Sequence, residues 1–453
     1  MNDLLLSLPA LIITLGVLIT VHEFGHFWVA RRLGVKVLRF SIGFGRPLWQ
    51  WRGKDGVEYV IAAIPLGGYV RMLDEREGEV PPHELFRAFN RRPVGVRIAI
   101  VLAGPLFNFL FAIFAYSLMY MVGVNGIKPL LDEPTPGSLA AAGGFRKGDL
   151  IVAIDGEPVP TLNTALLTLV DRALAEQLIK IEVRDAEDRL RVRTLDIRDA
   201  ENVTDAGQAF ERFGLTPWQP VLPPVIEQVD QGGAAERAGL QAGDRILVAD
   251  GEPIADWQQW RQVIERRPGR PFSVRIKRGE SEQVLEVTPN VRDNSQGRRV
   301  GFIGARAGTP DDRDLRVVVR YGPLDAVSAA MGKTWNMSVL TLRLLGRMLV
   351  GRASLDNLSG PLTIAKFAGQ AASAGLMAFL SLLALVSVSL GVLNLLPVPV
   401  LDGGHLLYYL IELVKGSPLS ESIQNVGQRV GIVVLLLLMG LALFNDFNHL
   451  LLG

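Results

Sequence analysis

The chain has 453 residues, more than one ordinary globular core holds, so two to four domains are expected. Hydrophobic residues make up 49% of the chain and the mean hydropathy is +0.27, which is typical of a membrane protein with sizeable water-exposed parts. A net charge of +1 gives no electrostatic reason to expect nucleic acid as a partner. Because cysteine is absent, disulfides and thiolate metal sites are excluded, and a metal would need His, Asp or Glu ligands.

Four apolar stretches are long enough to cross a bilayer, and they predict a membrane protein with a mainly α-helical transmembrane core. The first stretch begins MNDLLL, with an acidic and no basic residue, whereas a cleavable signal peptide usually begins with basic residues. We therefore expect a retained helix, with a signal peptide as the alternative. The four predicted spans are 1–30, 98–124, 371–401 and 429–447.

The distribution of basic residues predicts how these spans are oriented. The connection 31–97 is rich in Arg and Lys, whereas the N-terminal tail has none, so this connection should face the cytoplasm. Alternation then places both termini and residues 125–370 on the outer side, which is the periplasm in a Gram-negative cell. It also makes 402–428 a cytoplasmic loop.

The cytoplasmic connection contains a predicted β-hairpin. Between residues 38 and 72, runs rich in aromatic and β-branched residues flank the turn-like sequence RGKDG. A hairpin between two membrane helices would either lie at the cytoplasmic face or dip into the membrane as a re-entrant element, and both placements stay open.

An internal repeat lies between the second and third spans. Residues 137–159 align without gaps with residues 232–254, and each copy is typical of a short helix, a Gly-Asp turn, a strand and an Asp-Gly turn. A repeat of this length indicates a duplicated domain. The pattern resembles PDZ domains, which bind chain ends by strand addition, so we expect tandem β-rich α+β PDZ domains at 127–220 and 221–309. A pair of structural spacers is the alternative.

The segment 310–370 mixes charged residues with amphipathic stretches such as WNMSVLTLRLLGRMLVG. Such stretches predict helices on the outer side. These helices would either lie on the membrane surface or pack against the soluble domains, and both placements stay open.

The sharpest motif is His22-Glu23-Phe24-Gly25-His26 in the first span. Residues four apart lie on one face of a helix, so both imidazoles can reach one ion, with the glutamate beside them. This is the H-E-x-x-H pattern of zinc hydrolases, in which the glutamate acts as general base. Two His and a Glu inside an apolar helix are costly unless they are paired or functional. We therefore predict a zinc site here, rather than a satisfied polar cluster.

A third ligand is expected from the third span, because that span ends on the same side of the membrane as His22 and His26. Its last part, NLLPVPVLDGGH, contains prolines and glycines that break a helix. Non-helical chain at membrane depth is tolerated where it lines a cavity. Asp402 lies among these helix breakers and is the preferred third ligand, with His405 as the rival.

HEFGH in a first membrane helix and N-x-x-P-x-P-x-L-D-G in a late one together resemble the site-2 proteases, zinc metalloproteases of regulated intramembrane proteolysis. The resemblance covers all four spans, the hairpin and both repeats. It implies one Zn²⁺ per chain, held by His22, His26 and Asp402, with Glu23 as catalytic base. The resemblance and the predicted hairpin also suggest residues that contact substrate or shape its cleft: Gly43, Phe44, Gly45, Val60, Tyr69, Asn394, Pro397 and Pro399.

The resemblance further implies a multi-pass protein of the bacterial inner membrane with its active site near the cytoplasmic side. Its substrates would be single-pass membrane proteins, namely a pre-trimmed anti-sigma factor of the envelope stress response, and remnant signal peptides. A helical substrate must unwind before it is cut, and an edge strand carrying Val60 would pair with the unwound segment. The PDZ tandem would act as a periplasmic size-exclusion gate, in preference to binding a new C-terminus.

Two other functions fit parts of the sequence. A membrane metal carrier would explain the His residues but gives no role to Glu23 or to the repeats. A PDZ scaffold with a membrane anchor would explain the repeats but leaves the charged residues of the first helix unexplained.

Overall fold

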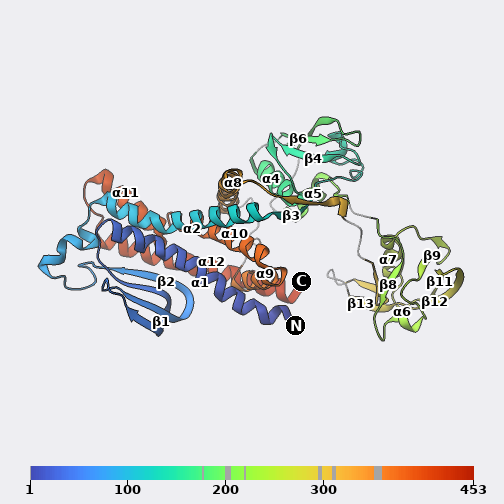
Figure 1. The fold of residues 1–453 in the computed structure, drawn as a ribbon, viewed down its shortest axis with the longest axis horizontal. Helices are drawn as coiled ribbons and strands as arrows, with labels where there is room; N and C mark the ends of the chain where they lie inside the picture. Colours follow the sequence, from blue (N-terminus) through green and yellow to red (C-terminus); the bar gives the residue numbers. More distant parts are fainter. Residues whose placement is uncertain are drawn as a thin grey trace.

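The computed structural model shows a bundle of long helices, a small bent sheet beside it, and two α/β units beyond one end of the bundle (Figure 1). Both chain termini lie at the end of the bundle that faces the α/β units (Figure 1). The described residues are 2–175, 178–198, 206–218, 221–293, 298–308, 313–350 and 360–452.

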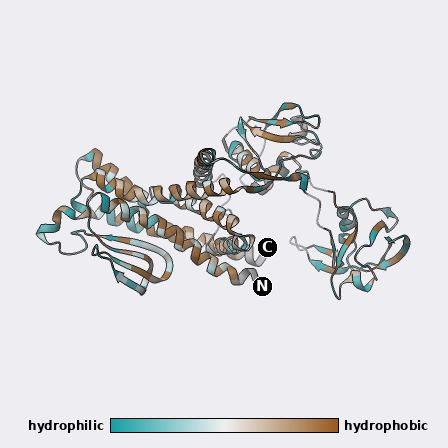
Figure 2. Ribbon diagram, in the orientation of Figure 1, coloured by the Kyte–Doolittle hydropathy of each residue, from teal (hydrophilic) through white to brown (hydrophobic). Residues whose placement is uncertain are grey.

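Four helices of the bundle are long and apolar enough to cross a membrane, so the prediction of four such helices is confirmed. Figure 2 shows hydrophobic residues along the bundle and a larger hydrophilic share in the α/β units. The second of these helices packs between the first and the third. The four are α1 (Asn2–Arg32), α2 (Val94–Val122), α10 (Leu376–Asn394) and α12 (Glu421–Leu452).

The start of the third span differs from the predicted position at 371. Residues 371–374 belong to a separate helix, α9 (Pro361–Ala374), which packs against α1. Gly375 ends this helix with a φ of 108°, a conformation that glycine adopts readily, and α10 begins at Leu376. The starting residue differs by five positions because the apolar run continues across the glycine without a change in composition.

Helix α11 (Asp402–Lys415) lies within the connection 402–428, which the sequence analysis predicts as a cytoplasmic loop without identifying a helix in it. The helix packs against α2. Arg97 of α2 donates to both carboxylate oxygens of Glu412 in α11, at 2.6 and 3.1 Å, and both side chains are largely buried. A bidentate ion pair of this kind fixes the orientation of α11 on the bundle.

Two bent strands, β1 (Val37–Arg52) and β2 (Glu58–Met72), form the predicted β structure beside α1 (Figure 1). Because both strands fold back, the first part of β1 lies between two parts of β2, and Phe40 is opposite both Val70 and Tyr59. The bend of β1 contains Gly43 and Gly45, with φ angles of 90° and 87°. Residues that have a side chain rarely adopt such angles.

Val60 does not lie in an edge strand, contrary to the expectation. It is opposite Ser41 on one side and Gln50 on the other, so it occupies the interior of the sheet. The edges are residues 68–72 of β2 and 47–52 of β1, each paired on one side only among the described residues. The expectation is wrong because a linear pattern does not show that a strand folds back on itself.

The two repeats form two α/β units with the same strand topology. Their four-stranded sheets have the orders β5-β4-β6-β7 and β10-β9-β11-β12. The elements of the first unit are α3 (Leu139–Ala142), β4 (Leu150–Ile154), β5 (Glu157–Pro158), α4 (Leu162–Ala175), β6 (Leu178–Arg184), β7 (Leu190–Asp196) and α5 (Ala206–Phe213). Those of the second are β8 (Ile226–Val229), α6 (Ala234–Arg237), β9 (Arg245–Ala249), β10 (Glu252–Pro253), α7 (Trp257–Glu265), β11 (Phe272–Arg278), β12 (Ser281–Val287), β13 (Asn290–Asp293), β14 (Arg299–Phe302) and β15 (Ala305–Ala307).

Equivalent aspartates of the two units play the same local role. Asp155 and Asp250, in the two Asp-Gly turns, adopt positive φ values of 47° and 53°. Asp149 and Asp244, in the two Gly-Asp turns, are buried, and each Oδ2 accepts a hydrogen bond from the backbone N–H three residues earlier, at 3.0 and 2.8 Å. The sequence repeat is therefore a repeat of turn structure.

The segment 310–370 contains a strand as well as helices. Strand β16 (Arg316–Val319) pairs antiparallel with β3 (Val124–Ile127), which follows α2. Helix α8 (Pro323–Leu349) then packs on the first α/β unit through Leu340 and on α2 through Ala330. The described chain also has three short 3-10 helices, η1 (Pro82–Arg87), η2 (Phe89–Arg91) and η3 (Arg313–Leu315).

Candidate metal centre

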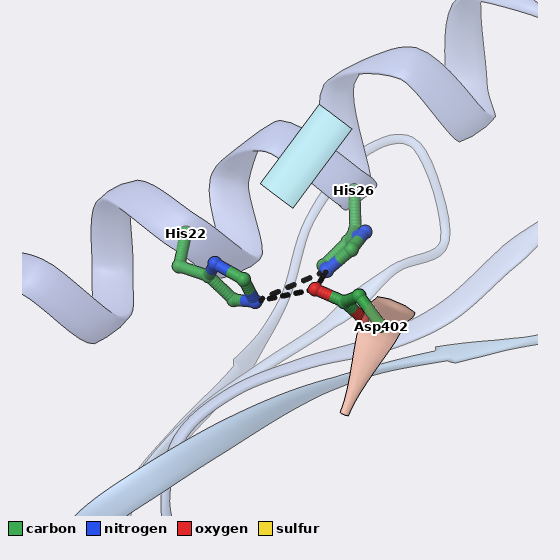
Figure 3. Close-up of side chains that lie close together, drawn as sticks. All are labelled: His22, His26 and Asp402. Carbon is green, nitrogen blue, oxygen red and sulfur yellow. Dashed lines mark hydrogen bonds and ion pairs between the residues drawn. The ribbon is translucent and has the colours of Figure 1, made fainter. Parts of the chain in front are cut away.

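His22 and His26 of α1 meet Asp402 at the start of α11. Figure 3 shows both imidazoles pointing from α1 toward the carboxylate. Nε2 of His22 lies 3.1 Å from Oδ2 of Asp402, and Nε2 of His26 lies 3.4 Å from the same oxygen. The two Nε2 atoms are 3.3 Å apart. Within the described residues, these three side chains form a group able to hold a metal ion, and His405 is not part of it.

The geometry of the three atoms fits a zinc ion. In a tetrahedral site with ligand distances of about 2.0–2.1 Å, neighbouring ligand atoms lie roughly 3.3 Å apart, close to the three observed separations. Oδ2 of Asp402 is buried without a hydrogen-bond donor from the described chain, so a cation would satisfy it. Two imidazoles and one carboxylate also match catalytic zinc sites that keep a fourth position for water.

The local electrostatics favour an ionised Asp402. Burial disfavours the charged carboxylate, but His22 and His26 outweigh this effect and hold the pKa of Asp402 well below its usual range. Burial lowers the pKa of His405, about one turn further along α11, so its ring is neutral at physiological pH. A deprotonated aspartate is the form that binds a cation.

Two glycines let α1 and α2 approach closely at the site. A Cβ atom on Gly25 would collide with the backbone of Ala103, and one on Gly104 would collide with the imidazoles of His22 and His26. Larger residues would therefore push α1 and α2 apart or displace the imidazoles.

A second pair of glycines positions Asp402. The chain leaves α10 and passes through the non-helical, proline-containing segment 395–401 before α11 begins. A Cβ atom on Gly403 would collide with the carbonyl groups of this segment, and one on Gly404 would collide with the backbone of Val398. The non-helical segment expected from the prolines and glycines therefore packs against Gly403 and Gly404, which directly follow Asp402.

Hydrogen-bond partners fix both imidazole rings. Nδ1 of His26 lies 2.8 Å from the carbonyl oxygen of Ile100, which accepts, so the proton is on Nδ1 and Nε2 is free for a metal. Nδ1 of His22 lies 3.2 Å from the side-chain amide of Asn108. A His22 that binds metal through Nε2 must donate from Nδ1, so Oδ1 of Asn108 should face it. This orientation also satisfies Oδ1, which otherwise has no partner in the described chain.

Asn108 is a positioning residue that the sequence analysis missed. Its only signal in the sequence is an amide within the apolar run of the second span. The residue is fully buried, and its backbone carbonyl accepts a hydrogen bond from the Ser387 hydroxyl of α10, at 2.8 Å. Asn108 therefore joins three helices at the point where His22 must be held.

Glu23 lies beside the cluster, in the wall of a cavity of about 550 Å³. Its carboxylate is half-buried and makes no hydrogen bond or ion pair with any described residue, so it is free to act on a water molecule. A Cβ atom on Gly68 would touch the Glu23 side chain, so the sheet edge 68–72 lies next to this carboxylate.

The predicted cleft residues divide into two groups. Tyr69 and Asn394 line the cavity, and Nδ2 of Asn394 lies 3.5 Å from both ring nitrogens of His22. Phe44 does not line the cavity but stacks on Tyr69, with ring centroids 6.2 Å apart. The others, which lie outside the cavity wall, are Gly43, Gly45, Val60, Pro397 and Pro399.

Comparison with known proteins gives the family of the chain. The regulator of sigma-E protease RseP of Escherichia coli (strain K12) is 45% identical over 451 residues, which cover 99% of this chain and all of that protein. The regulator of sigma E protease of Salmonella typhi gives the same figures, and the protease RseP of Yersinia pestis is 44% identical over 451 residues, again 99% of this chain and all of that protein. Residues 10–438 match the pattern of "Peptidase family M50". The resemblance to the site-2 proteases is thereby confirmed, and the chain belongs to peptidase family M50.

Proposed function

We propose that this chain is a zinc endopeptidase that cuts single-pass membrane proteins within, or at the edge of, the membrane. The observation that carries the proposal is the cluster of His22, His26 and Asp402 beside a free Glu23, between helices apolar enough to cross a membrane. A membrane metal carrier would use the three ligands but leaves the free carboxylate without a role. A scaffold would need none of the four residues.

The side chains around the cluster suit peptide hydrolysis. Zinc held by His22, His26 and Asp402 would polarise the scissile carbonyl and lower the pKa of a water molecule. Glu23 takes a proton from the attacking water and delivers it to the leaving amine. Asn108 keeps the ring of His22 oriented during these steps. No side chain forms a covalent bond with substrate, which agrees with the absence of cysteine.

The proposed function is tested with purified protein and a single-pass test substrate. We expect about one zinc ion per chain, cleavage near or within the membrane segment, loss of cleavage with 1,10-phenanthroline, and recovery on addition of zinc. A protease inhibitor that does not bind metal is the control, and cleavage should continue in its presence. If this inhibitor blocked cleavage, a contaminating protease would be responsible. A protein that contains zinc but never cuts a membrane-spanning substrate would contradict the proposal.

We place the metal centre near the cytoplasmic face of a bacterial inner membrane. Arg31 and Arg32 end α1, and the connection that follows is rich in basic residues, which favours the cytoplasmic side. Both termini lie at the opposite end, toward the α/β units (Figure 1), as an even number of crossings requires. The termini and both units would then be periplasmic.

The bent sheet would be a re-entrant element that dips into the membrane. Large apolar side chains are exposed on the parts of the sheet at and beyond its bend: Phe44, Leu48, Trp49, Trp51 and Ile64. Such a concentration of exposed apolar and aromatic groups suits the membrane and its interface better than water. Its interior strands have their backbone groups paired within the sheet, as membrane depth requires.

Substrate would bind by adding a strand to the edge 68–72. An unwound transmembrane segment leaves backbone groups unpaired, and a sheet edge can pair with them. This edge borders the same cavity as Glu23 and the metal ligands, whereas Val60 lies inside the sheet. The N–H of Leu73 donates inward to the carbonyl of Lys36, at 2.8 Å, so strand alternation directs the N–H of Val70 outward.

Val70→Pro is expected to slow cleavage of a helical substrate by about tenfold, because one backbone donor of the pairing edge is lost. Proline is tolerated where the N–H of an edge strand faces outward, so the sheet should still form. Val70→Ala is the matched control, since it shortens the side chain but keeps the N–H. The measurement is the cleavage rate at equal zinc content, and equal rates for the two variants would refute strand addition.

The two α/β units would be PDZ domains that gate access by size. They share one strand topology, and both lie beyond the same end of the bundle (Figure 1). The first unit is tied to α8 by Asn336, which donates to Glu157 at 2.5 Å, and by Arg343, which donates to Asp171 at 2.6 Å. Folded domains in this position would obstruct partners with bulky outer domains.

Removal of residues 129–314 is expected to let the enzyme cut substrates that retain a bulky outer domain. The N–H of Lys128 donates to the carbonyl of Leu315 at 2.8 Å, so a short glycine turn can join these residues without disturbing β3 and β16. Cleavage of a trimmed substrate at a similar rate by both proteins is the control for folding. Rejection of the untrimmed substrate by the shortened protein would argue against a size gate.

The substrate classes follow from the relatives. Their names as regulators of sigma E point to an anti-sigma factor, a single-pass membrane protein cut in the envelope stress response, as the natural substrate class. Remnant signal peptides are a second class that the same cavity would accept, because each is a short apolar helix without an outer domain.

A further inference from the structure

A second cavity, of about 1050 Å³, lies at the outer end of α2, away from the metal centre. It is bounded by α2, β3, α4 and α8, and none of the residues that line the metal cavity contributes to it. Three tyrosines contribute to its wall: Tyr116 and Tyr120 of α2, and Tyr321 before α8. Tyrosines gather at the level of lipid headgroups, where one end of the ring is apolar and the other is wet.

Among the described residues that line this cavity, Lys333 of α8 is the only one with a basic side chain. Its ammonium lies 5.2 Å from the centre of the Tyr116 ring, and burial lowers the pKa of Lys333. The ammonium makes no hydrogen bond or ion pair with any residue of the described chain. A largely buried cation of this kind is costly unless an anion accompanies it.

The acidic residues of the cavity are not available as that anion. Glu157 pairs with Arg172 at 3.1 Å, and Asp171 pairs with Arg343 at 2.6 Å. Asp325 is exposed in the first turn of α8, about two helical turns before Lys333. Among the described residues that line the cavity, no carboxylate therefore pairs with the ammonium of Lys333.

Helix α8, which borders the cavity, has the features of a helix at a membrane surface. In Figure 1 the helix is seen nearly end-on, so it runs across the direction of α1 and α2. One face of α8 exposes large apolar side chains at helical spacing: Leu324, Val327, Met331 and Trp335. Lys333 lies on the opposite face, with Ala326 and Ala330, which are buried. A helix with an exposed apolar face that lies across the membrane direction is typical of the lipid–water interface.

We propose that this cavity binds an anionic phospholipid, with the headgroup phosphate accepting hydrogen bonds from Lys333. The tyrosine hydroxyls are further donors to the phosphate oxygens. An acyl chain would lie along the apolar part of the wall, formed by Met119, Val124, Ile127, Leu162, Leu166 and Met337. Such a lipid would join α2, α8 and the first α/β unit, and its binding does not depend on proteolysis.

The test is binding of phosphatidylglycerol to the full-length protein in detergent, with phosphatidylcholine as the neutral reference. Lys333→Met is expected to weaken phosphatidylglycerol binding by about tenfold or more, the effect of one charge-assisted hydrogen bond. Lys333→Arg should retain most of the affinity. Lys366→Met is the matched control, because Lys366 is an exposed lysine of α9 outside the cavity, and it should bind like wild type.

Protection of Lys333 from acetylation, measured by mass spectrometry, identifies the source of the phosphate. We expect protection by phosphatidylglycerol and little by phosphatidylcholine or by millimolar inorganic phosphate. Equal protection by inorganic phosphate would overturn the lipid assignment in favour of a soluble phosphate site. Protection by a peptide with a free C-terminal carboxylate, but not by its amide, would overturn it in favour of a peptide-end site. Wild-type lipid affinity in Lys333→Met would remove the site altogether.

Discussion

Glu23→Gln is expected to lower the rate of substrate cleavage by about 10²–10⁴-fold, the usual contribution of general acid–base catalysis, while the zinc content stays at the wild-type value. Glutamine has nearly the size of glutamate but does not accept a proton at neutral pH, so the attacking water loses its base. Glu23 is outside the ligand cluster and makes no hydrogen bond or ion pair with the described residues, so its replacement should leave the fold intact. Single-turnover cleavage and zinc analysis of the same sample provide the measurement.

Glu77→Gln is the matched control for this variant. Glu77 lines the same cavity, but it is exposed and paired with Arg71 at 3.1 Å, so its loss should leave the cleavage rate close to wild type. Full zinc content with wild-type cleavage in Glu23→Gln would assign the base to another residue. Loss of zinc from the same variant would instead give Glu23 a structural role at the metal.

The parts of the structure that the sequence predicts are those set by local pattern. An apolar run long enough to cross the bilayer predicts a spanning helix, independently of what packs against it. The described residues contain four such helices. The spacing of His22 and His26 places them on one helical face by geometry alone. The Asp-Gly and Gly-Asp turns recur in both units because the same short sequence adopts the same turn twice.

The candidate third ligand, Asp402, could be predicted from the sequence for a different reason. Asp402 follows a long apolar helix and lies among prolines and glycines, which break a helix at membrane depth. That combination indicates a polar residue in a cavity rather than in lipid, and the structure places Asp402 beside His22 and His26.

Features that depend on distant contacts could not be predicted in this way. Val60 has strand neighbours on both sides because β1 and β2 fold back, which depends on backbone pairing across the sheet. Asn108 gains its role only because α2 packs beside α1, so in the sequence it is one amide in an apolar run. Helix α11 was not predicted because it begins with DGGH, a sequence typical of a loop. Its helical start depends on the packing of Gly403 and Gly404 against the preceding segment.

Asp402→Ala is expected to abolish measurable cleavage and to weaken zinc binding. Loss of a residue that only hydrogen-bonds to a metal ligand lowers metal affinity by ~10–100-fold, and loss of the ligand Asp402 itself should lower it by more. The variant removes the only carboxylate of the described cluster, so two imidazoles would have to hold a dication without a negative charge. Oδ2 of Asp402 lies within 3.4 Å of both Nε2 atoms, and no other carboxylate of the described chain belongs to the cluster. Competition with a chromophoric zinc chelator measures the affinity.

His405→Ala separates ligand loss from damage to α11, because both residues lie in the first turns of the same helix. His405 lines the cavity but is not part of the cluster, so this variant should keep zinc near wild-type affinity. Asp402→Asn separates loss of the charge from loss of the side chain at the start of α11, since asparagine keeps the size of the side chain but removes the charge. If Asp402→Ala and Asp402→Asn kept zinc while His405→Ala lost it, the third ligand would be His405. The cluster that links α1 to α11 would then not be the metal site, and Glu23 would need a different water to act on.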